Sequence, residues 1–140
     1  ALALVAAALD PRVVMCLADC PSHGRLASTL RGHPLMRSRR GRVPSCMTPQ
    51  SFETFLSYFD IANLCRRIVC PTIIGHNVGD LTVHIDGGLA AWKQLTSVPS
   101  DRKRLLLGAD RAHANPPPSR AAMQAWMDRV AQAHPAPWRD

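Results

Sequence analysis

The sequence lacks the long apolar run that would mark a membrane protein. Its longest such run, residues 1–9, has about half of the roughly 20 residues that a membrane-spanning helix needs. No basic segment and no methionine come before this run, so it does not have the form of a signal peptide. We therefore expect no membrane association. A sequence that begins inside an apolar run also predicts a truncated chain.

Lysine, glutamate and aromatic residues are scarce. The only lysines are Lys93 and Lys103, and Glu53 is the only glutamate. The net charge of +7 would suit a nucleic-acid partner. However, the arginines are spread along the chain, and 5% aromatic residues are too few to form a base-stacking platform. One group of arginines is clustered, and its composition is typical of a solvated loop: Arg37, Arg39, Arg40 and Arg42. We expect no nucleic-acid partner.

The cysteines lack the pairing expected of a disulfide framework or a structural zinc site. There are five of them, irregularly spaced, and none forms a C-x-x-C pair. Cys16 and Cys70 fall in apolar, strand-like runs, where a free cysteine behaves as a small buried hydrophobic residue. We therefore expect no cofactor and no metal. A reducing, cytoplasmic location is favoured.

Helices and strands are predicted to alternate along the chain. Apolar runs rich in strand formers predict buried strands at residues 13–18, 70–75 and 104–108. Apolar residues at helical spacing, with turn residues at the ends, predict five helices, at residues 1–9, from Pro49 to 59, 61–68, 86–95 and 120–133. This order predicts an α/β fold with a parallel sheet flanked by helices. Three strands are few for such a sheet, so residues 1–133 are expected to be part of one larger domain, with a tail at 134–140.

Two residues that could carry chemistry follow predicted strands. Asp80 lies in a Gly-Asp turn after the second strand, and His113 lies in a loop after the third. Sites in open α/β sheets form beyond the carboxyl ends of the strands. An Asp followed by a His is what a hydrolytic triad needs, in the chain order of the α/β-hydrolases. On position alone, an Asp like Asp80 is more often a turn residue and a His like His113 more often a loop residue.

A nucleophile is lacking. No G-x-S-x-G sequence occurs, and none of the nine serines sits in a strand-to-helix elbow. Such an elbow belongs immediately before a helix like that at residues 1–9, which is where the sequence starts.

Other histidine and aromatic residues fit structural roles better than catalytic ones. His76 and His84 flank the turn of Asp80, but lining a pocket or facing solvent is a better interpretation than a metal site with Asp80. Trp92, Trp126 and the half-buried Tyr58 are expected in the core.

Several segments resemble one known family. Residues 56–64, LSYFDIANL, look like the S-Y-F-D-x-x-N segment of the acetyl xylan esterase and cephalosporin-C deacetylase family, and residues 66–72 are similar to its R-I-x-x-P-V strand entry. Asp80 aligns with the family's catalytic Asp, which precedes an A-A-Y helix that reads A-A-W here. His113 matches the catalytic His. Residues 1–20 are similar to the segment after the family's G-G-S-Q-G-G elbow.

The resemblance implies the C-terminal half of a serine-type α/β-hydrolase. The intact enzyme would hydrolyse a small acetylated sugar, such as an acetylated xylo-oligosaccharide, or another small acyl ester, and it would be a homo-oligomer. His113 would be the general base and acid, and Asp80 its orienting partner. Two alternatives stay open: a non-catalytic binding or interaction fragment, and another α/β-hydrolase activity such as a peptidase.

Overall fold

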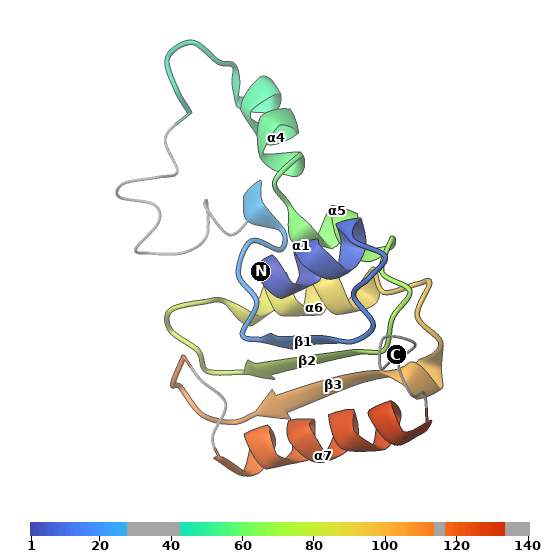
Figure 1. Cartoon of the computed structure of the whole chain (residues 1–140). Helices are drawn as coiled ribbons and strands as arrows, with labels where there is room; N and C mark the ends of the chain where they lie inside the picture. The colour runs from blue at the N-terminus through green and yellow to red at the C-terminus, as the bar shows by residue number, and fades with distance from the viewer. Residues whose placement is uncertain (28–42, 114–116, 134–140) are drawn as a thin grey trace.

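The computed structural model describes residues 1–27, 43–113 and 117–133. Its centre is a parallel sheet in the order β1-β2-β3, made of β1 (Cys16–Asp19), β2 (Thr72–Asn77) and β3 (Lys103–Gly108) (Figure 1). This confirms the predicted fold class. The predicted arginine-rich loop and the tail at 134–140 lie outside the described residues.

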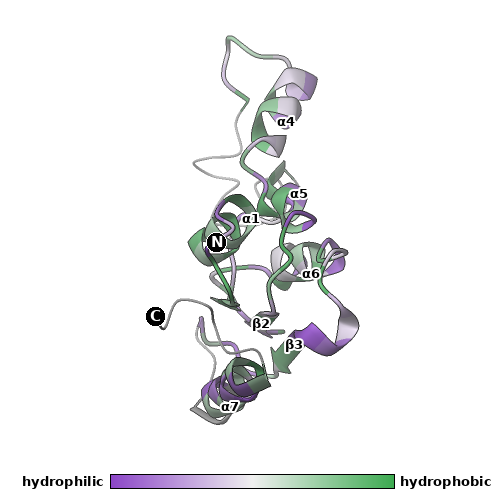
Figure 2. Cartoon of the chain, turned by 45° about the vertical axis from the view of Figure 1, so that its right-hand side comes forward, coloured by the Kyte–Doolittle hydropathy of each residue, from purple (hydrophilic) through white to green (hydrophobic). Residues whose placement is uncertain are grey.

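Helices cover both faces of the sheet. Figure 1 shows α1 (Leu2–Leu9), α5 (Ile61–Cys65) and α6 (Ile85–Lys93) on one face, and α7 (Pro117–Ala133) on the other. The residues of α1 are all hydrophobic (Figure 2), and Leu4, Ala7 and Ala8 are its buried residues, whereas Leu2 and Leu9 are exposed.

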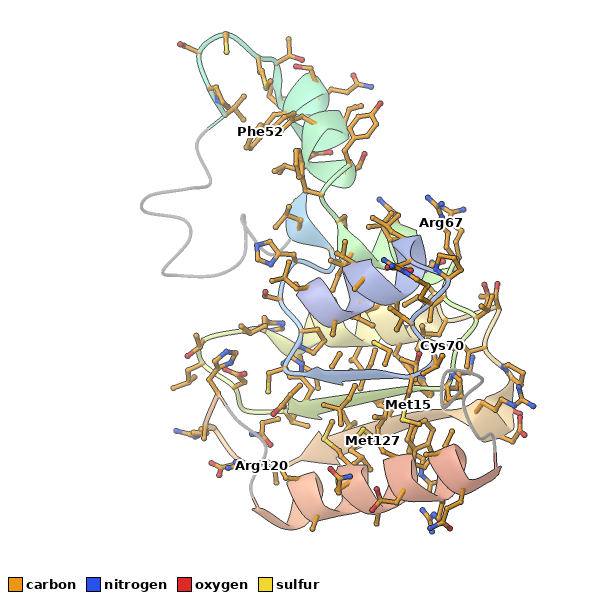
Figure 3. The ribbon with its side chains drawn as sticks, viewed as in Figure 1. Met15, Phe52, Arg67, Cys70, Arg120 and Met127 are labelled. Atoms are coloured by element: carbon orange, nitrogen blue, oxygen red, sulfur yellow. The ribbon has the colours of Figure 1, made fainter. Side chains whose placement is uncertain are left out.

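Alternate residues of β2 fill the two halves of the core. Ile74 packs with the helices on the α1 side, and its neighbour Ile73 packs with Met123 and Trp126 of α7. Both isoleucines are fully buried, and each such side chain stabilises the fold by roughly 1.5–3 kcal/mol relative to exposure. Met15 and Met127 approach each other between the sheet and α7 (Figure 3), and both pack against the cluster around Ile73.

Helix α4 (Pro49–Ser57) stands away from these layers (Figure 1). Its start is as predicted, since the Thr48 side chain accepts a hydrogen bond from the Ser51 amide and Pro49 is the first helical residue. The rings of Phe52 and Phe55 stack at a centroid distance of 6.4 Å, and the ring of Phe59 is tilted against that of Phe55 at 5.0 Å. Because this helix does not reach the sheet, the prediction of a half-buried core Tyr58 is wrong: that residue is 77% exposed.

The other elements differ from the prediction mainly at their ends. The first strand starts at Cys16 rather than at residue 13, because its partner β2 starts only after Pro71, which has no N–H for the ladder. The last helix starts at Pro117, since proline is tolerated in a first turn. Trp126 is buried as expected. Trp92 is only partly buried, and its ring lies 5.4 Å from the Lys103 ammonium.

The segment after β1 packs directly on the backbone of α6. A Cβ atom on Gly24 would overlap the Gly87 carbonyl, and a Cβ on Gly87 would lie 2.9 Å from the Gly24 oxygen. Both positions therefore need glycine for a close approach of two backbones. The contact joins the segment after β1 to the helix that follows the turn of Asp80.

Replacing Gly24 with alanine is expected to lower the free energy of unfolding by about 1–3 kcal/mol, because backbone atoms must move to admit the methyl group. Urea denaturation of the chain measures this change. Thr96→Ala, at an exposed position, is the control and should stay within about 0.5 kcal/mol of the parent. A Gly24→Ala variant as stable as the control would show that the two backbones are not in close contact.

Candidate active site

Asp80 lies in the turn that follows the central strand β2. Its amide donates to the Asn77 carbonyl at 3.2 Å. Its Oδ1 accepts hydrogen bonds from the amides of Thr82, at 2.7 Å, and Val83, at 2.9 Å. An aspartate that binds the amides just after it is typical of a tight turn, and here it fixes the carboxylate beyond the carboxyl end of the strand.

The second carboxylate oxygen of Asp80 meets His113. Oδ2 lies 2.8 Å from Nδ1 of the imidazole. An ionised carboxylate can only accept, so Nδ1 carries the proton and donates it to the hydrogen bond. The Asp80 side chain is fully buried, whereas the His113 side chain is 44% exposed. The structure thus brings the two predicted residues together, with the carboxylate inside and the imidazole at the surface.

The surroundings of Asp80 favour its charged form. Burial raises the pKa of this carboxyl group, but the hydrogen bonds from His113, Val83 and Thr82 outweigh burial, so the pKa lies below its usual value. Asp80 is therefore ionised at neutral pH, as a partner that orients a histidine must be.

The loop that carries His113 is tied to the loop that carries Asp80. Backbone bonds run from the Val78 amide to the Gly108 carbonyl, at 2.8 Å, and from the Gly79 amide to the Asp110 carbonyl, at 3.2 Å. The Asn77 side chain donates to the Ala112 carbonyl at 2.9 Å. These bonds set the distance between the carboxylate and the imidazole.

Sequence reasoning did not assign Asn77 and Asp110 to the site. Oδ1 of Asp110 accepts from the amides of Arg111, at 2.6 Å, and Ala112, at 3.2 Å, so it shapes the turn that leads to His113. An Asp placed three residues before a candidate catalytic residue is a turn signal that could have indicated this role. The Asn77 contact spans two strands and has no such local signal.

The two histidines beside Asp80 have different surroundings. His76 is fully buried, so pocket lining and exposure are both wrong for it; its Nε2 lies 3.0 Å from the Val83 carbonyl and 4.0 Å from Oδ2 of Asp80. His84 is exposed, as expected, and its Nδ1 accepts from the Asp86 amide at the start of α6. Among the described residues, the metal-ligating side chains grouped with Asp80 are those of Cys20 and His113, and His84 is not in this group.

Cys20 also lies at this edge of the sheet. It follows β1, has a left-handed backbone (φ 42°), and its amide donates to the Gly75 carbonyl at 2.8 Å. Burial raises the pKa of its thiol to about 12. A thiol that stays protonated at neutral pH is a poor nucleophile, so Cys20 does not replace the missing serine.

Two hollows of about 400 and 360 Å³ are formed by the described residues, and neither is lined by Asp80 or His113. The larger lies between β3 and α7, and the smaller lies beside α5 and α6. The chain's described helices include none that is long and apolar enough to cross a membrane.

Three parallel strands between two helical layers, with an Asp–His pair at the carboxyl edge, define the class of protein. This is the C-terminal part of an α/β-hydrolase fold.

The comparisons with known proteins narrow this class. No protein-family model matches the chain. The chain is 32% identical over 97 residues to acetyl esterase Axe7A of Xylanibacter ruminicola. The aligned segment covers 69% of the chain and 22% of that protein. It matches the structure of an acetyl xylan esterase from Paenibacillus sp. R4 with a TM-score of 0.69 and 26% identity, over 91% of the chain and 41% of the esterase.

A third match shows the fold alone. Acetyl xylan esterase 1 from Thermoanaerobacterium sp. JW/SL YS485 aligns with a TM-score of 0.63 and 19% identity, over 91% of the chain and 41% of that protein. The chain spans less than half the length of each of these three proteins. The chain is thus similar in sequence to an acetyl esterase and in structure to acetyl xylan esterases, which confirms the resemblance.

Proposed function

We propose that these 140 residues are part of a serine carboxylic-ester hydrolase that removes acetyl groups from sugar hydroxyls. The observation that carries this proposal is the hydrogen bond between Asp80 and His113 at the carboxyl edge of the sheet. It occurs in a chain that is homologous to enzymes named acetyl esterase and acetyl xylan esterase. The serine would lie in a segment that precedes Ala1.

The geometry of the pair suits general acid and base catalysis. With Nδ1–H held by Asp80, the lone pair of His113 is on Nε2, the nitrogen that takes the serine proton as the serine oxygen attacks the acetyl carbonyl. The same proton then passes to the sugar oxygen as the ester C–O bond breaks. Water attacks the acetyl-enzyme with His113 again as the base, and acetate leaves as the serine is reprotonated. Asp80 holds the tautomer and stabilises the imidazolium throughout.

The test is to read the coding sequence upstream of Ala1 and to express the longer protein. We expect an in-frame G-x-S-x-G before the first helix, and saturable release of acetate from acetylated xylo-oligosaccharides. The 140-residue chain is the matched control. Because loss of a triad nucleophile lowers kcat by about 10⁶-fold, the chain alone should release no measurable acetate.

Three results would contradict the proposal. The first is a start codon just before Ala1 with no serine elbow. The second is a longer protein that cleaves peptides and leaves acetyl esters intact. The third is steeply salt-dependent DNA binding that does not change when Asp80 or His113 is replaced, which would favour a binding fragment.

A further inference from the structure

Three side chains with metal-ligating atoms meet at the carboxyl edge of the sheet. Cys20, Asp80 and His113 each offer one such atom, a sulfur, a carboxylate oxygen and a ring nitrogen, and these atoms all lie within 4.8 Å of one another. The three residues come from the segments that follow β1, β2 and β3. The parallel sheet therefore brings them together, although the first and the last are 93 positions apart in the sequence.

This set of atoms suits Zn²⁺. Zinc takes sulfur, nitrogen and oxygen ligands at about 2.0–2.3 Å, so two ligand atoms of a tetrahedral site lie about 3.5 Å apart. Small movements of the side chains would bring the three atoms to such distances. A soft thiolate also selects Zn²⁺ over Mg²⁺ or Ca²⁺, which prefer oxygen ligands.

The burial of the three residues favours an open site. Cys20 and Asp80 are buried and would hold the cation from inside, while His113 is 44% exposed on the solvent side. A fourth position, facing solvent, is left for a water molecule, as in zinc sites with three protein ligands. The positive φ of Cys20 and the bond from its amide to the Gly75 carbonyl hold the backbone of Cys20 beside β2.

We propose that Cys20, Asp80 and His113 form a Zn²⁺ site, and that Zn²⁺ bound there blocks the general base of the proposed hydrolase. On binding, the S–Zn bond forms as the thiol proton leaves to solvent. A cation on Nδ1 of His113 would displace the proton of that nitrogen to Nε2 and break the hydrogen bond to Asp80. A cation on Nε2 would occupy the lone pair that accepts the serine proton. Either way, the imidazole is lost to catalysis.

Direct binding tests the site without any enzyme assay. The protein is the 140-residue chain with Cys46→Ser, which removes the one exposed thiol among the described cysteines. Titration with Co²⁺, as a spectroscopic substitute for Zn²⁺, should give one equivalent with a thiolate-to-cobalt band in the near ultraviolet. Zn²⁺ should displace the Co²⁺ and abolish the band.

Two variants in the same background identify the ligands. Cys20→Ser should abolish the near-ultraviolet band, and His113→Ala should weaken Co²⁺ binding at least tenfold, with circular dichroism to show that each variant is folded. Parent-like binding by a folded Cys20→Ser variant would overturn the site. So would a parent protein that takes up no Co²⁺.

The inhibition rests on the proposed function and is tested separately, in the longer protein. We expect Zn²⁺ to suppress acetate release and a chelator to restore it. Zn²⁺ should lower acetate release by Cys20→Ser much less than it lowers acetate release by the parent. Each protein is compared with its own rate in the absence of metal. Metal binding by a longer protein with no esterase activity would refute the proposed function and leave the site intact. Full activity in the presence of saturating Zn²⁺ would refute the inhibition alone.

Discussion

Replacing His113 with alanine is expected to lower kcat for acetyl ester hydrolysis by about 10⁴- to 10⁶-fold in the longer protein. The imidazole is the group that the structure places between the buried carboxylate of Asp80 and solvent, at 2.8 Å from Oδ2. Alanine removes the base that would take the serine proton and the acid that would protonate the leaving sugar oxygen. Steady-state release of acetate, with the enzyme concentration set by active-site titration, measures the loss.

The matched control is His84→Ala. His84 is also an exposed histidine near the turn of Asp80, but its ring nitrogen caps α6. We expect this variant to keep its kcat within a few-fold and to lose about 1 kcal/mol of stability, as is typical of a lost helix cap. If His113→Ala also keeps kcat within tenfold, His113 is not the general base and the proposed mechanism is wrong.

The order of the elements, together with the family resemblance, made it possible to predict the pairing of Asp80 with His113. Each residue follows a strand rich in β-branched or leucine side chains, and the carboxyl ends of parallel strands share one edge of the sheet. This expectation does not depend on the conformation of the loops that carry Asp80 and His113. The fold class follows from the same alternation of strands and helices.

The contacts that refine the site could not be predicted in this way. Asn77 meets the carbonyl of Ala112, 35 residues away, and this contact depends on how two loops close over each other. Cys20 reaches the site through a left-handed backbone, a conformation that a cysteine does not signal. The prediction for Tyr58 failed for a related reason: helical spacing shows that a helix forms there, but it does not show where that helix packs.

Replacing Asp80 with asparagine is expected to lower kcat for acetyl ester hydrolysis in the longer protein by about 10⁴-fold, with little change in the positions of the backbone atoms. An amide offers both a donor and an acceptor, so it no longer requires the proton of His113 to be on Nδ1, and it cannot stabilise the imidazolium. Nitrogen NMR of the histidine ring in the 140-residue chain checks the tautomer without an enzyme assay. The parent should show Nδ1–H, and an unchanged tautomer in Asp80→Asn would contradict the assigned role.

The same variant should alter how stability depends on pH. The pKa of Asp80 is lowered in the folded chain, so this carboxylate contributes stability that is present above its unfolded pKa, about 3.9, and is lost as the pH falls through the folded value. Asp80→Asn has no such contribution to lose. The difference in urea midpoint between parent and variant should therefore shrink as the pH is lowered from neutral towards 3.

Asp10, whose pKa is lowered to about 2 by its hydrogen bonds with Arg12, titrates in both proteins and cancels from the difference. A difference that stays constant with pH would show that the Asp80 carboxylate gains nothing on folding from its hydrogen bonds with His113, Val83 and Thr82. The hydrogen bond to His113 would then not form in solution.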